Sequence, residues 1–489
     1  MAAKSDKARI FTMDKTLYNQ PKCFRYGKHL LLSFLSLFCL SGSRAGSPEI
    51  RILFVGDVLL SRNVKEEIQS RHTFPWDNLK SLFHSADIVA GNLEGAVGDL
   101  PHLSNPEGKS PVFNINRSDI SLLDKAGFNI ITIENNHSFD LGAEGKTATI
   151  EALNNSNVTP VYAENSPRFF TVKDVVISLL ALNIVLSRDS SKNQIPSIET
   201  EQKLRLAKSL SNIVIVSIHW GSELLDWPNR EQRETAKWLI KNGADIIIGS
   251  HAHVIQKPEL IEGKPVFYSL GNHLFDQKYP ITKEGLIVDI RIQNGKFSCN
   301  GILTHTRHNS FYPEIIDTID FGFGAIPYRN TLLRVNDYAL KPVSVTEGNN
   351  PKIILQAFQN EQMVWATHPM SVVSLSSCKL DGENEYLFAL EKHYSSLDNE
   401  MNVRPYVYSL DNKGLIARWR GSALAWPLID AQITHADNKI LCALHRGDSF
   451  IKLDKKTTQK RIAAYSWNGF GFKGIPDTSA CKLCDELYK

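Results

Sequence analysis

At 489 residues the chain is longer than one ordinary domain of roughly 100 to 200 residues, so we expect more than one folded unit. Its composition, 42% hydrophobic and 22% charged, is that of a globular protein and excludes a chain disordered over its whole length. Residues 1–45 carry eight Lys/Arg and two Asp/Glu, so the net charge changes from +3 to −3 without them. Because no basic surplus remains to hold a phosphate backbone, we expect no nucleic-acid partner.

The N-terminal segment has the pattern of an export signal. Basic residues precede the eleven-residue apolar run Leu30–Leu40, and small residues follow it up to Ala45. The run is shorter than the ~20 residues that a helix needs to cross a bilayer, which favours cleavage over a retained membrane anchor. We therefore predict a signal at residues 1–45 and an exported protein of the periplasm or cell envelope.

Residues 50–297 alternate short apolar runs with amphipathic stretches. The apolar runs predict strands: IRILFVGD, DIVAG, FNIITIE, VVISLLALN, NIVIVSIHW and ADIIIGS. The stretches between them predict helices, among them SDISLLDKAG, GKTATIEALNNS and REQRETAKWLIKNG. Strands separated by helices predict a layered α/β domain.

The rest of the chain has a different pattern. Residues 298–345 are rich in turn signals without a clear period, and we expect a linker or loop region there. Residues 346–489 predict an all-β domain with a weak internal repeat, in which 379–390 resembles 435–444 and 404–415 resembles 461–472. Repeats at this spacing predict a propeller-like or other β-repeat domain, although two and a half units are too few to close a ring alone.

Five cysteines lie beyond the signal, too scattered to predict a disulfide framework. The last two, Cys481 and Cys484, form a single CxxC that could close a small loop in an oxidising compartment.

Polar side chains follow six of the predicted strands, at the point where each strand ends. They are Asp57, Asn92, Glu94, Asn135, Asn136, His137, His219, His251, His253, Asn272 and His273. Because the carboxyl ends of strands in an open α/β sheet share one edge, we expect these side chains to meet. Carboxylate, amide and imidazole groups without cysteine form a ligand set that suits Mn²⁺, Zn²⁺ or Fe, and we predict one or two such divalent ions.

The spacing of His251 and His253 constrains the backbone between them. Residues two apart share a face only in extended backbone, so we expect the chain to remain extended as it leaves the strand ADIII.

Six segments in order resemble the motifs of the CapA family of poly-γ-glutamate capsule synthesis proteins: FVGDVLLSR, GNLEGAV, ENNHSFDLG, SIHWGSE, GADIIIGSHAHVIQ and YSLGNHLFDQ. The resemblance implies a domain similar to the calcineurin-like metallophosphatases, a four-layer αββα sandwich, over residues 50–297. Carried over by position, it implies the metal ligands Asp57, Glu94, Asn136, His219, His251 and His253. It also implies a catalytic role for His137 and Asn136.

Three motifs depart from the metallophosphatase pattern. Leu59 stands where the first motif usually has a histidine, and the second motif reads NLE in place of GD. In the last motif, His273 stands where CapA-like proteins commonly have an aromatic residue. A further ligand would then have to come from elsewhere. Possible additional ligands are Asn92, Glu223, Asn272, His273 and Asp276.

Three functions are compatible with these motifs. The first is a CapA-like envelope protein that acts in synthesis, transport or anchoring of poly-γ-glutamate or a similar anionic polymer, with membrane-associated capsule synthesis or export proteins as partners. The second is a metal-dependent phosphoesterase, a hydrolase acting on a phosphorylated envelope substrate. The third is a non-catalytic binding protein. Fold and ligands alone do not choose among them.

Overall fold

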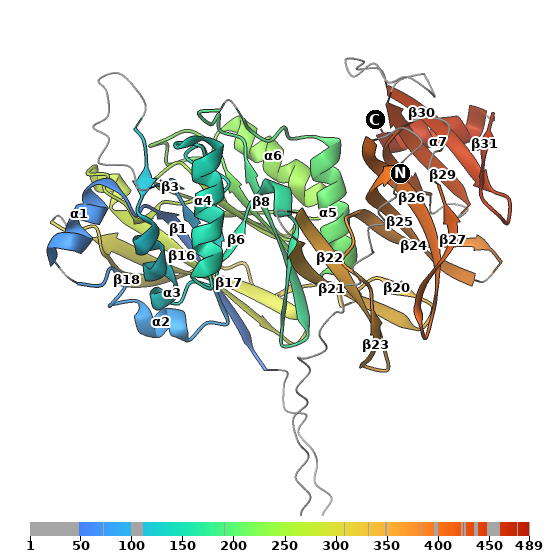
Figure 1. The fold of residues 1–489 in the computed structure, drawn as a ribbon. Helices are drawn as coiled ribbons and strands as arrows, with labels where there is room; N and C mark the ends of the chain where they lie inside the picture. Colours follow the sequence, from blue (N-terminus) through green and yellow to red (C-terminus); the bar gives the residue numbers. More distant parts are fainter. Residues whose placement is uncertain are drawn as a thin grey trace, which may run out of the picture. The chain divides into compact units, whose positions relative to one another are not determined.

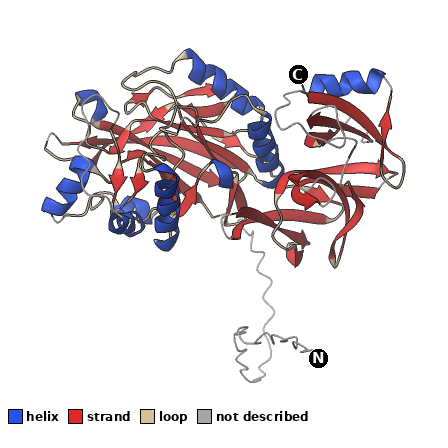
Figure 2. Cartoon of the chain, turned by 45° about the horizontal axis from the view of Figure 1, so that its top comes forward, coloured by secondary structure: helices blue, strands red, loops and turns tan. Residues whose placement is uncertain are grey.

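The computed structural model describes residues 48–488 except 72, 99–110, 190, 308, 331, 348–349, 383, 396–399, 422–423, 425–426, 435–438, 447–459 and 477. The predicted export signal lies outside the described residues. None of the helices in the described part is long and apolar enough to cross a membrane. Figures 1 and 2 show helices flanking strands in the first half of the chain, and mostly strands in the second half.

Two sheets form the first half. The nine-stranded sheet runs β18 (Pro313–Asp320), β17 (Lys296–Thr306), β16 (Glu284–Gln293), β1 (Ile50–Val58), β2 (Ile88–Leu93), β5 (Ile130–Thr132) and β6 (Thr159–Val161), with β15 (Asn272–Leu274) on β1 and β19 (Ile326–Pro327) on β17. The six-stranded sheet runs β12 (Glu259–Ile261), β13 (Lys264–Phe267), β10 (Ile246–Ser250), β9 (Ile213–His219), β8 (Val175–Asn183) and β7 (Arg168–Val172). The central pairs β1–β2, β2–β5, β8–β9 and β9–β10 are parallel.

Helices cover the outer face of each sheet. They are α1 (Arg62–Arg71), α2 (Lys80–His84), α3 (Ser121–Ala126) and α4 (Gly142–Asn155) beside the first sheet, and α5 (Ile198–Leu210) and α6 (Arg230–Lys241) beside the second. Short 3₁₀ turns lie at Arg117–Ile120, Ala163–Asn165 and Pro280–Thr282, and two small ribbons pair β3 (Ala96–Val97) with β4 (Asn114–Ile115) and β11 (Ile255–Gln256) with β14 (Ser269–Leu270).

Three apolar clusters separate four layers. One lies between the nine-stranded sheet and its helices and contains Leu53, Val89 and Leu123. A second fills the space between the sheets, where side chains such as Ile52 meet Ile215. The third lies between the six-stranded sheet and helices α5 and α6. Alternate residues of the same strand thus pack into different clusters, one on each face of the sheet. The layers therefore have the predicted order helix, sheet, sheet, helix.

Residues 298–345 are not the linker that turn-rich composition predicted. Strand β17 pairs with β16 over its whole length, and β18 and β19 pair with β17 in turn. The part of this segment up to Pro327 therefore widens the nine-stranded sheet, and its last residues belong to the four-stranded sheet described below. The sequence signal was weak because β18 is mostly exposed or half-buried, so its side chains lack an apolar period.

The second half is built mainly from antiparallel sheets. Four strands form one sheet: β20 (Arg334–Val335), β21 (Tyr338–Glu347), β22 (Asn350–Gln359) and β23 (Gln362–Ala366). Eight form another: β24 (Val372–Asp381), β25 (Asn384–Ser395), β26 (Glu400–Asp411), β27 (Gly414–Arg420), β28 (Leu428–Ile433), β29 (Ile440–Arg446), β30 (Lys460–Trp467) and β31 (Phe472–Ile475). The described strands close no ring, so a propeller is not confirmed.

A helix, α7 (Thr478–Tyr488), ends the described chain, so the prediction of an entirely β region was wrong there. A disulfide joins Cys442 of β29 to Cys484 of α7. The expectation of a small loop closed within CxxC is thereby corrected, because Cys484 bonds to a cysteine 42 residues earlier.

Contacts join α5 to the second half. Asp430 on β28, whose side chain is 1% exposed, accepts hydrogen bonds from Arg205 Nη2 at 2.7 Å and Gln202 Nε2 at 2.9 Å. Apolar residues of α5, including Leu206 and Leu210, share a cluster with Leu355 and Leu387. The two halves therefore pack through a mixed apolar and charged interface.

Candidate metal centre

The carboxyl ends of strands from both sheets meet at one place. In the first sheet, Asp57 at the end of β1 is in register with Asn92 on β2, and Glu94 follows β2 directly. In the second sheet, His219 ends β9 and pairs in register with Ser250 at the end of β10. The predicted convergence of polar side chains at the strand ends is therefore present, with donors from two sheets.

A glycine allows β1 to approach its neighbour closely beside the site. A Cβ at Gly56 would lie 2.0 Å from the carbonyl oxygen of Gly271, far inside van der Waals contact. The backbone N–H of Asp57 donates to that same carbonyl at 3.0 Å. Only glycine at position 56 leaves space for this contact, which fixes the place from which the Asp57 side chain projects.

Asp57, Glu94 and His219 form the core of the site. One ligand atom from each lies within 4.8 Å of those of the other two, and all three residues are at most 1% exposed. Nδ2 of Asn92 donates to Oδ1 of Asp57 at 2.9 Å, so the predicted possible ligand Asn92 orients a carboxylate. Nε2 of His219 lies 2.8 Å from Oδ1 of Asn136, and its Nδ1 lies 2.9 Å from Oγ of Ser250.

His251 and His253 lie beside this core, but not on the extended backbone that their spacing predicted. Their φ angles are 94° and 59°, so both adopt the left-handed region that disfavours side chains with a Cβ. The backbone N–H of His251 donates to Oδ2 of Asp57 at 3.3 Å, and Nδ1 of His253 donates to Oδ1 of Asn272 at 2.9 Å. Such backbone outliers cluster at functional sites, since their cost of about 1 to 3 kcal/mol each must be offset by surrounding contacts.

Burial sets the protonation states of the imidazoles. It lowers the pKa of His219 well below the ordinary value, with a contribution from the positive charge of His251, and it lowers the pKa of His251 to about 4. Burial alone would also lower the pKa of His253, but the Glu94 and Asp57 carboxylates outweigh it and raise that pKa to about 9. Two neutral imidazoles are therefore available as lone-pair donors near pH 7.

The carboxylates show why a cation fits here. Burial, and next the charge of Asp57, raise the pKa of Glu94 well above its ordinary value. Over the described part of the chain, Oε2 of Glu94 and Nδ1 of His251 have no hydrogen-bond partner although both atoms are buried. Unsatisfied buried acceptors are costly unless a ligand or ion meets them. The donor set, two carboxylates with imidazoles, is one that Mn²⁺, Zn²⁺ or Fe accepts.

His137 is held by a carboxylate that the sequence reading did not single out. Its Nδ1 donates to Oδ2 of Asp140 at 2.8 Å, and its ring stacks on Phe113 with centroids 3.8 Å apart. Asp140 also accepts a hydrogen bond from Nε of Arg188 at 2.8 Å. With Nδ1 so engaged, Nε2 is the nitrogen of His137 left to take or give a proton.

Three of the possible additional ligands lie elsewhere. His273 turns into the core, where its Nε2 accepts a hydrogen bond from Nε1 of Trp76 at 3.0 Å and burial lowers its pKa to about 3. Asp276 pairs with Arg62 at 2.7 Å. Glu223 is exposed and acts on the centre only through its charge, which raises the pKa values of Glu94 and His253. None of the three belongs to the carboxylate–imidazole cluster.

Sequence reasoning missed Asp140 and Ser250, which orient His137 and His219. Signals for both were present, because Asp140 lies three residues after His137 and Ser250 directly precedes His251 at a strand end. No sequence signal marked Phe113 or Arg188, which reach the site from distant segments.

Comparisons with known proteins match this same part of the chain. Residues 51–277 match the family described as bacterial capsule synthesis protein PGA_cap. The chain is 26% identical over 309 residues to the PGA biosynthesis protein CapA of Bacillus subtilis, covering 57% of this chain and 81% of that protein. It is 27% identical over 270 residues to the capsule biosynthesis protein CapA of Bacillus anthracis, covering 51% of this chain and 65% of that protein.

Residues 51–277, called the CapA domain below, are therefore similar to the CapA family of capsule synthesis proteins. Among solved structures, a phosphatase from Mycoplasma pneumoniae is similar with 17% identity and a TM-score of 0.32, over 58% of this chain and 95% of that one. The CapA domain contains every residue of the candidate centre, from Asp57 to Asn272. Most of the second half of the chain, including the whole eight-stranded sheet, lies beyond the matched residues.

Proposed function

We propose that the chain acts in the synthesis, transport or anchoring of poly-γ-glutamate or a similar anionic polymer, and that its CapA domain does so with a bound divalent metal. The observation that carries the proposal is the buried cluster of Asp57, Glu94 and His219 at the strand ends of that domain. The named functions of the two CapA relatives, in capsule or PGA biosynthesis, support the choice of polymer.

Asp57, Glu94 and His219 would hold the metal, with His251, His253 and Asn136 next to them. A divalent ion in such a site supplies a Lewis acid and an acidified water. Asn92 orients Asp57 by its 2.9 Å hydrogen bond, and the closed surroundings keep bulk water from the carboxylates. His137, fixed through Nδ1 by Asp140, would present Nε2 to a leaving group.

Hydrolysis of a phosphoester is a second candidate, favoured by the His137–Asp140 pair. A histidine oriented by a buried carboxylate is suited to protonating a leaving oxygen, as phosphoester cleavage requires. An aryl phosphate assay of the metal-loaded protein tests this activity.

Export is part of the proposal and is supported by the Cys442–Cys484 disulfide. Disulfides persist in the periplasm and outside the cell but are rare in the cytosol. We therefore propose that residues 1–45 direct the chain out of the cytoplasm and are removed.

Metal analysis of the purified chain from residue 46 onward tests the centre directly. We expect one equivalent in the wild type, because one cluster of three ligands occurs in the described residues. Asp57→Asn and His219→Ala should lose it, whereas His84→Ala, an exposed histidine at the end of α2, should retain it. A wild-type protein that binds no Mn²⁺, Zn²⁺ or Fe would contradict the proposal and favour a purely binding role.

The polymer role is tested separately by deleting the gene from its host. We expect less envelope-associated anionic polymer, restored by the wild type but not by Asp57→Asn. Unchanged polymer in the deletion strain would exclude this role whatever the metal content.

A further inference from the structure

A large pocket lies where the first half of the chain meets the second. Its volume is about 1130 Å³, and its walls come from β7 and α5 on one side and from β22, β25 and β26 on the other. Pockets for small molecules commonly measure about 300 to 1,000 Å³, so this one has room for a segment of a longer chain. Its lining residues from Ser344 onward lie outside the matched CapA domain.

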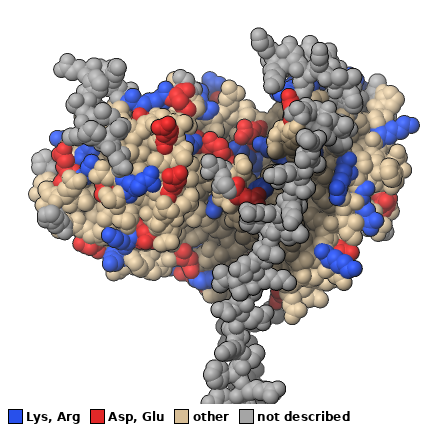
Figure 3. Space-filling view, viewed as in Figure 1, with Lys and Arg blue, Asp and Glu red and all other residues tan. Residues whose placement is uncertain are grey.

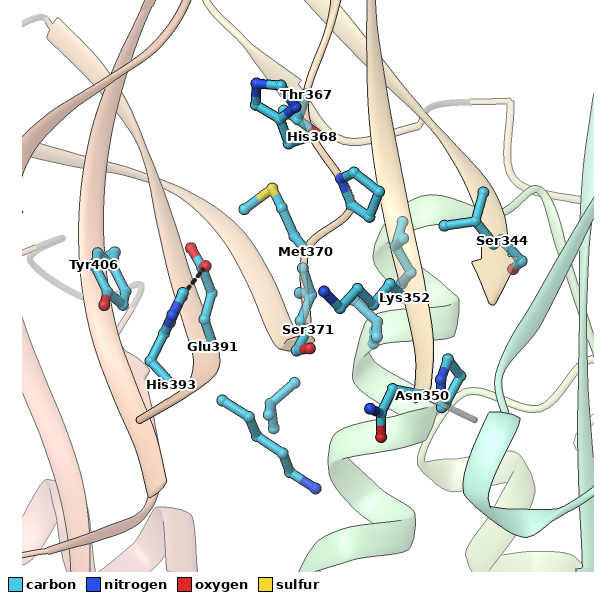
Figure 4. Close-up of a pocket in the computed structure, with 18 of the residues that line it drawn as sticks. Ser344, Asn350, Lys352, Thr367, His368, Met370, Ser371, Glu391, His393 and Tyr406 are labelled. Atoms are coloured by element: carbon cyan, nitrogen blue, oxygen red, sulfur yellow. Dashed lines mark hydrogen bonds and ion pairs between the residues drawn. The ribbon is translucent and has the colours of Figure 1, made fainter. Parts of the chain in front are cut away.

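The acidic side chains that line the pocket are already engaged. Glu164 pairs with Lys146 at 3.3 Å, and Glu199 pairs with Lys203 at 2.8 Å. Glu391 is buried on the pocket wall, where it accepts hydrogen bonds from Tyr408 Oη and His393 Nε2, each at 2.8 Å. Figure 4 shows His393 and Glu391 on one wall, and Lys352 on the other.

Basic side chains outnumber the acidic ones. The lining contains Arg168, Lys203, Lys352, Lys392, Lys413 and Arg420. Lys203 and Lys352 have carboxylate partners, Glu199 and Glu347. The other four form no ion pair with any described residue. Figure 3 shows acidic and basic side chains interspersed over the first half of the chain.

Arg168 gives the clearest sign of a missing anion. It is half-buried, and among the described residues its guanidinium donates a hydrogen bond only to Oγ1 of Thr346, at 3.4 Å. Burial lowers the pKa of its guanidinium from the ordinary value, and no carboxylate acts against that shift. A partly desolvated cation without a counter-ion is costly, and a bound anion would offset the cost.

The same pocket offers apolar surface to the uncharged part of a ligand. Tyr406 and Tyr408 stack with ring centroids 5.7 Å apart and an angle of 6°, and His393 lies 5.2 Å from Tyr406. Met370 and Met401 also line the space. Aromatic and methionine side chains pack well against methylene groups, so the pocket suits a ligand with both carboxylates and aliphatic carbons.

We propose that this pocket binds a segment of a polycarboxylate chain, such as a run of glutamate residues. The four unpaired cations belong to separate segments, β7, β25, the turn after β26, and β27, which matches charges spread singly along a chain better than one phosphate group. The identification of the ligand as a glutamate polymer rests on the proposed function. That the ligand carries several carboxylates is inferred from the side chains of the pocket alone.

The test is binding of a fluorescently labelled oligomer of γ-linked glutamate to the whole chain from residue 46, measured by anisotropy at low salt. Wild type should bind saturably. The double variant Lys392→Glu/Arg420→Glu changes two exposed side chains and should weaken binding about tenfold or more, because each reversal turns an attraction into a repulsion. Lys237→Glu/Lys241→Glu, with the same charge change on exposed positions of α6, should bind within about twofold of wild type.

Competition experiments define the chemistry of the ligand, and a comparison of variants distinguishes the pocket from the metal centre. Oligoglutamine of equal length and inorganic phosphate should not compete, whereas oligomers with α- or γ-linked glutamate should. Absence of saturable binding, equal weakening in both double variants, or competition by oligoglutamine would overturn the proposal. Lys392→Glu/Arg420→Glu should keep the metal content of the wild type while binding the oligomer more weakly, so failure of the metal centre and failure of the pocket are distinguishable.

Discussion

The carboxylate of Asp140 links three segments around His137, and its removal tests how the candidate centre is held. Its side chain is 1% exposed, and Oδ2 accepts hydrogen bonds from the backbone N–H of Phe113 at 2.7 Å and from Nδ1 of His137 at 2.8 Å. Oδ1 accepts a third from Nε of Arg188 at 2.8 Å. The two bonds to Oδ2 are partly buried, whereas the side chain of Arg188 is 34% exposed.

These contacts predict an order among three variants. A hydrogen bond to a charged group contributes about 1.5 to 3 kcal/mol, so Asp140→Ala should lower local stability by about 3 kcal/mol after partial replacement by water. Asp140→Asn keeps an oxygen for Phe113 and His137 and should lose about 1 kcal/mol. Arg188→Ala removes only a screened surface pair and should lose less than about 1 kcal/mol.

Hydrogen exchange at the amide of Phe113 measures this loss at the site itself. A loss of about 3 kcal/mol would make exchange in Asp140→Ala on the order of 100-fold faster than in wild type. Exchange in Arg188→Ala should change less than in either Asp140 variant. If Asp140→Ala exchanged at the wild-type rate, the carboxylate would not hold Phe113, and the account of how His137 is oriented would be wrong.

Three further predictions concern other contacts. Asp430→Ala should lower the free energy of unfolding by about 2 kcal/mol, since Arg205 loses a buried partner, and Asp430→Asn should lose less; urea unfolding of both variants measures the difference. His273→Phe should keep the full metal content while losing about 1 to 3 kcal/mol, because Trp76 loses its acceptor; loss of metal would show that His273 is a ligand after all. Without reductant, digestion should yield a peptide pair linked through Cys442 and Cys484, and Cys484→Ser should cost about 2 to 4 kcal/mol; finding both thiols free in the exported chain would refute the pairing.

The layered first half and the centre at its strand ends follow from sequence patterns. Buried parallel strands have nearly continuous apolar runs, and polar residues directly after them stand out, as Asp57 and His219 do. The convergence of these side chains needs only the rule that such strand ends share an edge. Register then determines which side chains touch, and it comes from long-range pairing such as Asp57 with Asn92.

Predictions from the sequence were wrong where tertiary contacts override local preference. Spacing two residues apart predicted an extended HAH segment, but His251 and His253 have positive φ values because contacts to Asp57 and Asn272 override the local preference. His273 follows the same strand-end pattern as the candidate ligands, yet Trp76 donates a hydrogen bond to it inside the core. A polar residue after a strand can thus either join the candidate metal centre or form a hydrogen bond inside the core. Only its neighbours in space determine which of the two occurs.

Leu59 marks the difference between this centre and the metallophosphatase pattern. Its side chain is fully buried in the apolar cluster beneath the helices of the first sheet, and its N–H donates to Leu274 O at 2.8 Å. A histidine there would therefore replace core packing as well as add a nitrogen. The two carboxylates are instead accompanied by His219 and by His253, whose pKa they raise to about 9. The positive charge that this pair of acids holds on His253 is of the kind that a divalent ion would supply, so Asp57 and Glu94 would offer an ion two carboxylates without a ligand at position 59.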